Sequence, residues 1–411
     1  MPIVIAHPTG NEFSKAAVRG FFDKNILQSY YTTVANFRGS VLDKLGAFRG
    51  LSEIKRRDLD SCLRSYTRTF PWKELGRQVA LKTGATTLTK HETGSFSVDA
   101  VYKSFDRYVS KQLDKEKKNG ATAVYAYEDG AYYTFQKAAG LNLQCLYDLP
   151  IGYWRSLHRV LQEEKELNPV WAITMEGLKD SKEKLARKDE ELRLSDAVFV
   201  ASSFTEKTLN DYPIPLKKIY KIPYGFPPAV QKDYAVNKRG KIKALFIGGL
   251  SQRKGLSYLF KAVEGLERFV DLTVVGRLPQ TSCEPLMREL DKHTYISSLP
   301  HKQVLELMRE QDVLLFPSLF EGFGQVITEA MAQGTPVITT ERTAGPDIIR
   351  HGENGWLVNA GSAEAIKNVL EQIISQPAVI AELGEQALET AKKRPWTVYG
   401  EDLVKAVLME N

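Results

Sequence analysis

Two glutamates, Glu321 and Glu329, begin and end a segment that reads EGFGQVITE. The two glycines of this segment would let an anion approach the backbone closely. A helix beginning at Gln325 would add unpaired N–H groups and the positive end of its dipole. Eight residues rise roughly 12 Å along a helix axis, which suits a ligand with a diphosphate between two hydroxyl-rich rings. The pattern predicts a nucleotide-sugar site, and two unrelated solvated carboxylates are the alternative.

A second stretch has the composition of a phosphate-binding loop. It reads GGLSQRKG from Gly248 to Gly255, follows an apolar run over Lys243–Ile247, and precedes a helix expected near Leu256. A glycine turn followed by Arg253 and Lys254 at a helix start favours an anionic ligand.

The elements that must position these residues follow from periodicity. A buried strand is expected over Val313–Phe316, a helix from Gln325, and a strand over Val337–Thr339. These three elements form a βαβ unit with the glycine turn at the mouth of its helix. A strand over Leu272–Val275 ends at Gly276, and it belongs to the same sheet.

The stretch from Leu314 to Val358 resembles the signature of GT-B fold glycosyltransferases of family 4. Glu321 and Glu329 match the two glutamates of that family's E-x7-E motif, and Lys254-Gly255 matches its Lys-Gly pair. Gly249 stands where the family has a phosphate-binding arginine. The family's glycine pair followed by Glu corresponds to residues 343–347, where this chain has Ala344 and Asp347.

The resemblance implies an α/β fold with two Rossmann-like domains facing an interdomain cleft. We expect an acceptor-binding domain over 1–220, a nucleotide-sugar-binding domain over 221–392, and a terminal helix over 393–411 that returns to the first domain. Pro213–Pro228, with five prolines and one glycine, suits the linker.

The activity implied is retaining, metal-independent transfer of a sugar from a nucleotide-sugar donor to an acceptor hydroxyl of a glycan or lipid-linked molecule. No cofactor is expected. Lys254 with Arg253 would stabilise the departing diphosphate, Glu329 would hold the ribose, and Glu321 would contact the transferred sugar. The expected donor-binding residues are Gly248, Gly249, Arg253, Lys254, Gly276, Glu321, Gly322, Phe323, Gly324, Gln325, Val326 and Glu329.

In the amino-terminal half, a strand over Pro2–His7 followed by Gly10 and Asn11 opens a Rossmann-like unit. Carboxylates also follow two later strands, at Glu128-Asp129 and at Asp148. Sites in parallel sheets lie at the carboxyl ends of strands. We therefore predict Asp148 as a third catalytic candidate beside Glu321 and Lys254, and a turn residue before Leu149-Pro150 is the alternative. Gly10, Asn11, Glu128 and Asp129 are predicted to line the acceptor side of the cleft.

Helical periodicity is expected over Val41–Arg57, Val98–Leu113 and Leu161–Arg193.

The bulk composition of the 411 residues is that of a soluble globular protein. Its three cysteines are odd in number and far apart, which favours a reducing, cytoplasmic compartment. No metal-ligand spacing and no nucleic-acid motif is present, and no signal peptide is expected.

The net charge of +6 is concentrated in the stretch 38–82, which has eleven Lys or Arg against five Asp or Glu. This stretch either contacts an anionic membrane surface or an anionic substrate, or is a solvated face. The triplet Asp58-Leu59-Asp60 follows three basic residues instead of an apolar strand, so we interpret it as chance.

Two other functions share these features. A sugar-nucleotide epimerase also uses the GT-B fold, and a catalytically silent nucleotide-sugar-binding subunit would keep the same turn. The departure at Gly249 keeps the second alternative open.

Overall fold

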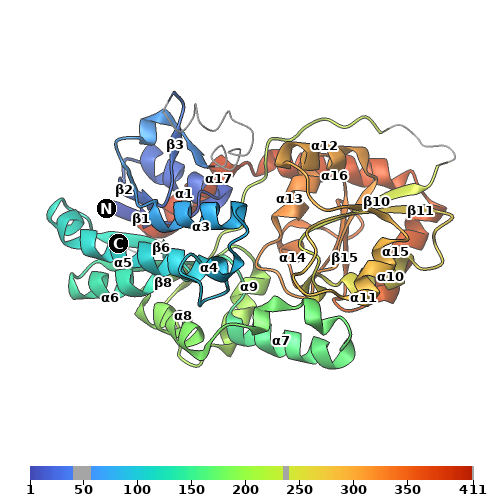
Figure 1. Cartoon of the computed structure of the whole chain (residues 1–411). Helices are drawn as coiled ribbons and strands as arrows, with labels where there is room; N and C mark the ends of the chain where they lie inside the picture. Colours follow the sequence, from blue (N-terminus) through green and yellow to red (C-terminus); the bar gives the residue numbers. More distant parts are fainter. Residues whose placement is uncertain (40–56, 235–239, 410–411) are drawn as a thin grey trace.

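The computed structural model describes residues 1–39, 57–234 and 240–409, which form two α/β domains lying side by side (Figure 1). The amino-terminal domain is built on a parallel sheet of strand order β5-β2-β1-β6-β7-β8-β9. Its strands are β1 (Ile3–Ala6), β2 (Leu27–Thr32), β5 (Thr67–Thr69), β6 (Ala123–Tyr127), β7 (Gln144–Leu149), β8 (Ala197–Val200) and β9 (Ile219–Lys221). The central strands are buried on both faces, as parallel strands covered by helices must be.

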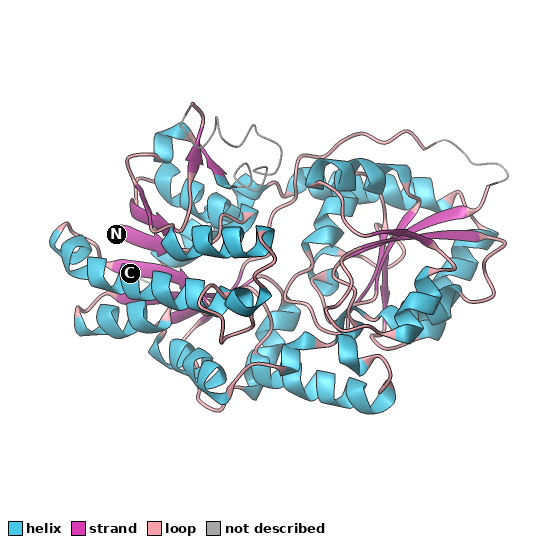
Figure 2. Cartoon of the chain, in the orientation of Figure 1, coloured by secondary structure: helices cyan, strands magenta, loops and turns pink. Residues whose placement is uncertain are grey.

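Helices cover both faces of this sheet (Figure 2). One face packs on α5, α6 and α8 through residues such as Phe105 and Phe135. The other face packs on α1 and α17 through residues such as Phe21 and Leu403. The helices of the first half of the chain are α1 (Glu12–Asp23), α3 (Trp72–Lys82), α4 (Thr86–Thr89), α5 (Val98–Lys118), α6 (Tyr132–Gly140), α7 (Trp154–Leu167), α8 (Lys182–Leu194) and α9 (Ser203–Thr208).

The carboxyl-terminal domain has a second parallel sheet, of strand order β12-β11-β10-β13-β14-β15. Its strands are β10 (Ile242–Ile247), β11 (Val270–Val275), β12 (Thr294–Ile296), β13 (Val313–Phe316), β14 (Val337–Thr340) and β15 (Trp356–Val358). Its helices are α10 (Leu256–Val263), α11 (Glu284–Leu290), α12 (His301–Glu310), α13 (Gln325–Ala332), α14 (Gly345–Ile348), α15 (Ala363–Ser375) and α16 (Val379–Lys393). The expected two-domain α/β architecture is confirmed.

The last helix, α17 (Trp396–Leu408), returns to the amino-terminal domain as expected. Its bounds lie within the predicted range 393–411. It crosses α1 closely, because a Cβ on Gly20 would lie 2.7 Å from the Gly400 carbonyl oxygen. Two glycines at one crossing therefore let the backbones approach, and Tyr399 and Leu403 enter the amino-terminal core.

The predicted helical segment Leu161–Arg193 is instead two helices, α7 and α8, separated by 3₁₀ turns at Ala172–Thr174 and Glu176–Leu178. The break falls at Asn168-Pro169, because proline cannot donate the backbone hydrogen bond that a helix interior requires. Trp171, just beyond the break, lies in the core of the carboxyl-terminal domain and stacks on Phe260. The chain from α7 to Trp171 thus spans both domains.

The first 60 residues also contribute a short second sheet. Strand β2 ends at Thr32, and a separate β3 (Asn36–Phe37) pairs with β4 (Asp58–Leu59). The amphipathic helix predicted over Val41–Arg57 lies outside the described residues, except for Arg57. No helix within the described ranges is both long and apolar enough to span a bilayer.

Candidate functional site

The site is built where the carboxyl ends of β10 and β13 lie next to each other. After β10 the chain makes the Gly248-Gly249 turn, then a 3₁₀ turn over Gln252–Lys254, and then α10. Gly255 has φ +74°, and a Cβ on it would lie 2.0 Å from the Pro317 carbonyl oxygen. Only glycine fits there, so this loop packs directly on the loop that leads to Glu321.

Gly276 fixes the other side of the same loop. A Cβ on Gly276 would lie 1.8 Å from the Gly248 carbonyl oxygen. Gly249, by contrast, has open space where its Cβ would be. The turns after β10, β11 and β13 therefore form one edge, with room beside Gly249.

Arg253, Lys254 and Glu321 meet at this edge. Arg253 NH1 donates to Glu321 Oε2 at 3.1 Å and to the Phe320 carbonyl oxygen at 2.6 Å. Lys254 Nζ donates to the same carboxylate oxygen and lies 4.8 Å from the centre of the Phe316 ring. The structure thus brings Glu321 to the adjacent residues Arg253 and Lys254, which lie 68 and 67 positions before it in the sequence.

Burial and charge set the protonation of this cluster. Burial alone would raise the pKa of Glu321, but Lys254 and Arg253 outweigh it and hold that pKa below its ordinary value. Burial lowers the pKa of Lys254, and Glu321 offsets only part of that effect. The cluster thus holds an ionised carboxylate between two cations.

Helix α13 begins beside this cluster. Gly324, with φ +86°, precedes it and turns the chain into the helix. The side-chain nitrogen of Gln325, the first residue of α13, is buried and makes no hydrogen bond within the described residues. Because buried polar atoms nearly always have partners, this amide is a donor available to a ligand.

The second glutamate lies further along α13. Glu329 Oε1 is 2.9 Å from His301 Nε2, at the start of α12. Sequence reasoning did not single out His301, whose position at a helix start after Pro300 gives no ligand signal. Glu329 therefore sits apart from the cations that hold Glu321.

The amino-terminal domain clamps the turn at Gly322. The hydroxyls of Ser202 and Thr205 both donate to the Gly322 carbonyl oxygen, the latter at 2.8 Å. A Cβ on Gly322 would lie 2.1 Å from the carbonyl oxygen of Pro150, the residue after β7. The carboxyl ends of the two sheets thus meet here.

A buried network holds the cationic turn from the opposite side. The amide of Gln252 donates to Glu164 of α7 at 2.7 Å, and its backbone N–H donates to the Thr174 hydroxyl at 2.8 Å. Sequence reasoning missed these partners, because nothing local links α7 to this loop.

Asp148 lies in the interior of the amino-terminal domain. Tyr125 donates to its carboxylate at 2.6 Å, and burial raises the pKa of Asp148 to about 7. Its surroundings are the tyrosines Tyr127, Tyr224 and Tyr399. A catalytic role for Asp148 stays a prediction, and the structure does not bring it to the Lys254–Glu321 cluster.

The other amino-terminal candidates, like Asp148, make contacts within their own domain. Glu128 and Asp129 form ion pairs with Lys188 of α8, at 3.1 and 3.6 Å. Asn11 precedes α1, directly after Gly10. His7, which the sequence analysis did not single out, ends β1 buried against Tyr127, and burial lowers its pKa to about 3.

One group in the described part of the chain has the geometry of a metal site. His91, Glu92 and Asp180 offer ligand atoms within 4.8 Å of one another. Both carboxylates are already engaged, Glu92 by the backbone N–H of Ser181 and Asp180 by Lys184. Asp58 likewise accepts from Asn36 at 2.6 Å.

Comparison with known families places the cationic turn and the E-x7-E segment together in one domain. Residues 231–394 match the family model of glycosyl transferases group 1. Solved structures share the whole architecture. The sucrose-phosphate synthase of Thermosynechococcus elongatus superposes with a TM-score of 0.67 at 17% identity, covering 100% of this chain and 98% of that one. The chain therefore has the GT-B fold, and its match to the group 1 family is confined to residues 231–394.

This GT-B protein also resembles the Anabaena protein HepE, solved with UDP-glucose, at a TM-score of 0.63 and 14% identity over 100% of both chains. Among curated sequences, it is 28% identical over 222 residues to the MMP α-(1→4)-mannosyltransferase of Mycolicibacterium hassiacum, covering 52% of this chain and 53% of that protein. It is 30% identical over 183 residues to the D-inositol 3-phosphate glycosyltransferase of Pseudarthrobacter chlorophenolicus, covering 42% and 43%. The chain thus spans about half the length of the curated relatives it matches.

Proposed function

We propose that this protein is a retaining glycosyltransferase that moves a sugar from a nucleotide-sugar donor to an acceptor hydroxyl without a metal ion. The observation that carries the proposal is the cluster of Arg253, Lys254 and Glu321 at the start of α13. Two cations and an unpaired Gln325 amide face one helix start, which is the donor set that a diphosphate needs.

In this proposal the donor's diphosphate takes over Arg253 and Lys254 from Glu321. Phosphate oxygens then accept from both cations, from the Gln325 amide and from the first N–H groups of α13. Glu329, further along the helix, accepts from the ribose hydroxyls. The open space beside Gly249 leaves room for the donor where the resembling family has an arginine.

Release from the two cations leaves Glu321 next to the sugar being transferred. Positive charge develops on the sugar ring as its bond to the diphosphate breaks, and a carboxylate there stabilises that charge. The acceptor oxygen bonds to the anomeric carbon on the face that the diphosphate leaves, which retains the configuration. The acceptor's hydroxyl proton passes to the departing phosphate oxygen.

Relatives support the donor class and the stereochemistry. HepE was solved with UDP and with UDP-glucose. A trehalose-6-phosphate synthase studied for glycosyl transfer with retention superposes at a TM-score of 0.61 and 11% identity. One curated relative is a mannosyltransferase, which favours a hexosyl donor.

The acceptor side of the proposal rests on the amino-terminal domain. Gly10 and Asn11 follow β1 at the sheet edge that also carries Pro150, the residue against Gly322. A glycan or lipid-linked acceptor hydroxyl would approach the donor from there. Glu128 and Asp129 would act only through the position of that edge, because Lys188 holds both.

A peripheral contact with an anionic membrane is proposed for the basic stretch 38–82. In its described part, Trp72, Leu75 and Val79 are exposed on one side of α3, with Lys73 and Lys82 on the same helix. Apolar side chains beside cations are typical of helices that lie on anionic membranes. Sedimentation with phosphatidylglycerol-containing vesicles should weaken as salt rises and weaken again in Trp72→Ala. Equal sedimentation with pure phosphatidylcholine would contradict this contact.

The experiment that tests the function is a thermal-shift screen against nucleotide sugars, followed by product analysis with the best ligand. A ligand that binds only the folded protein raises its melting temperature. We expect one nucleotide sugar to stabilise the protein, and transfer to an acceptor to continue in EDTA. A free epimerised nucleotide sugar as product would identify an epimerase, and binding without turnover a silent subunit. Activity lost in EDTA and restored by manganese would refute the metal-independent mechanism.

A further inference from the structure

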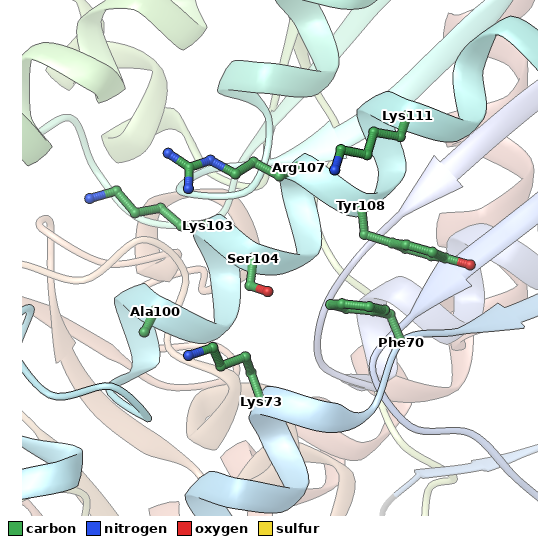
Figure 3. Close-up of a pocket in the computed structure, with 8 residues that line it drawn as sticks. All are labelled: Phe70, Lys73, Ala100, Lys103, Ser104, Arg107, Tyr108 and Lys111. Carbon is green, nitrogen blue, oxygen red and sulfur yellow. The ribbon is translucent and has the colours of Figure 1, made fainter.

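A groove between α3 and α5 lies outside the site described above. It has a volume of about 490 Å³ and is lined by Phe70, Lys73, Ala100, Lys103, Ser104, Arg107, Tyr108 and Lys111 (Figure 3). Four of these eight residues are cationic, and none is acidic. The groove therefore gathers positive charge around a concave surface.

Three of the cations form a row on one helix. Lys103, Arg107 and Lys111 follow one another at intervals of four residues on α5, so they lie on the same side of the helix and span roughly 12 Å. Like charges at this spacing repel one another. Lys73 faces them from α3 across the groove.

The charge of this row is only partly compensated. Lys103 lies 3.3 Å from Asp99, but Asp99 also accepts from the buried Arg187. Arg107 bonds the neutral Tyr133 hydroxyl at 2.7 Å. Lys111 makes no side-chain hydrogen bond or ion pair within the described residues. Positive charge is thus left over at the mouth of the groove.

One wall of the groove is a fixed aromatic surface. Phe70 and Tyr108 stack with ring centres 4.4 Å apart and an interplanar angle of 9°. The backbone N–H of Phe70 donates to the Thr32 carbonyl oxygen at the end of β2, which ties the wall to the sheet. The cations therefore face a preformed surface.

Helix α3, which forms one side of the groove, is connected to the turn after β1. Arg57 donates to the Pro8 carbonyl oxygen at 3.1 Å and to Glu74 of α3, also at 3.1 Å. This bridge attaches α3, and with it Lys73, to the turn that contains Gly10. None of the groove's lining residues belongs to the Arg253–Lys254–Glu321 cluster.

We propose that this groove binds a phosphate-bearing group at a site separate from the donor site. Phosphate suits the row because its oxygens accept from Lys and Arg together, and because a dianion neutralises two neighbouring cations. The volume exceeds that of one phosphate, so the aromatic wall is left for the apolar or ring part of the same ligand.

The test is calorimetric titration of the full chain with inorganic pyrophosphate, without divalent metal. The groove component should weaken tenfold or more in the double variant Lys103→Glu/Arg107→Glu and persist in Arg253→Ala/Lys254→Ala. The matched control is Lys115→Glu/Lys118→Glu, which makes the same charge change on α5 outside the groove. The single variant Lys111→Glu removes no side-chain hydrogen bond or ion pair among the described residues, so it should fold normally and still weaken binding about threefold.

Vesicles of phosphatidylcholine with and without phosphatidic acid separate the two sources of phosphate. Sedimentation with phosphatidic acid, competed by pyrophosphate and lost in the groove variant, would identify a lipid headgroup. Pyrophosphate binding without sedimentation would identify a soluble phosphorylated ligand. Absence of both, or equal loss in the groove variant and its control, would overturn the proposal. Because neither measurement needs the donor or turnover, failure of the proposed transferase activity would not affect it.

Discussion

Replacing Glu321 with glutamine tests whether this carboxylate holds the place of the donor's phosphates. Glutamine keeps the volume of glutamate but removes the charge between Arg253 and Lys254. At 3.1 Å the Coulomb attraction of the Arg253 pair is about 5 kcal/mol at an effective dielectric constant of about 20. The side chains of Glu321, Arg253 and Lys254 are 17%, 25% and 12% exposed, so solvent screens the cluster little.

Removing one partner of a buried ion pair costs about 3–5 kcal/mol, because the other charge stays buried. We expect Glu321→Gln to lower the free energy of unfolding of the unliganded protein by about 3 kcal/mol, the low end of that range, since the amide still accepts a hydrogen bond. A bound diphosphate compensates the same cations and should recover at least half of this loss. By linkage, affinity for the nucleoside diphosphate should rise tenfold or more, since about 1.4 kcal/mol corresponds to a factor of ten.

The assay combines thermal unfolding with and without nucleoside diphosphate, calorimetry of its binding, and steady-state kinetics. The ligand-induced rise in melting temperature should be larger in Glu321→Gln than in the wild type, while kcat falls about 100-fold. The control is Glu329→Gln, on the same helix, whose partner is the exposed His301. This control should raise the donor KM more than it lowers kcat and change the unliganded stability little. Nucleotide binding lost in Glu321→Gln but kept in Glu329→Gln would refute the exchange between carboxylate and phosphate.

Two further predictions concern the amino-terminal domain and its contact with the site. Burial raises the pKa of Asp148 to about 7 from 3.8, so the folded protein holds a proton that the unfolded chain loses, and stability falls as pH rises between these values. The wild type should lose up to roughly 4 kcal/mol of folding free energy over this pH range, and Asp148→Asn should not. The melting temperature of the variant relative to the wild type should therefore be higher at pH 8 than at pH 5. The same difference in melting temperature at both pH values would contradict the burial of this carboxylate. In Gly322→Ala the added Cβ would lie 2.1 Å from the Pro150 carbonyl oxygen, so this variant should lose about 1–3 kcal/mol of folding free energy and have a lower kcat. Gly249 has open space where its Cβ would be, so the folding free energy of Gly249→Ala should stay within about 0.5 kcal/mol of the wild type. Equal melting temperatures for these two alanine variants would contradict the close contact between the domains.

Sequence alone identified the carboxyl-terminal half of the site because the signals there are local. A buried strand, a glycine turn and a helix start follow one another within about 15 residues at Val313–Ala332 and again at Ile242–Val263. Each unit specifies its own anion-binding helix start through backbone geometry. Parallel strands place such helix starts on one edge of the sheet. The sequence therefore predicts that Lys254 and Glu321 lie near each other.

The hydrogen bonds within this part of the site depend on tertiary packing. Glu321 reaches both cations because Gly255 packs directly on Pro317. The turn at Gly322 is held in place because Ser202 and Thr205 of the other domain donate hydrogen bonds to it. The same limit explains the segment Leu161–Arg193. Its charge pattern continues through Asn168-Pro169, while its role as a bridge between domains depends on Trp171 reaching a distant core.

The amino-terminal candidates show most clearly what the sequence could not decide. A carboxylate at the end of a parallel strand is equally suited to a cleft and to a core, and only the surrounding side chains distinguish the two. Tyr125 and Tyr399 enclose Asp148, and Lys188 holds Glu128. The groove of α3 and α5 likewise joins residues about 30 positions apart that share no motif. Sequence determined the strands, the turns and the candidate residues for phosphate binding, because these depend on neighbours along the chain. Tertiary structure alone decided which charges are paired, buried or left free, because those states depend on contacts between distant segments.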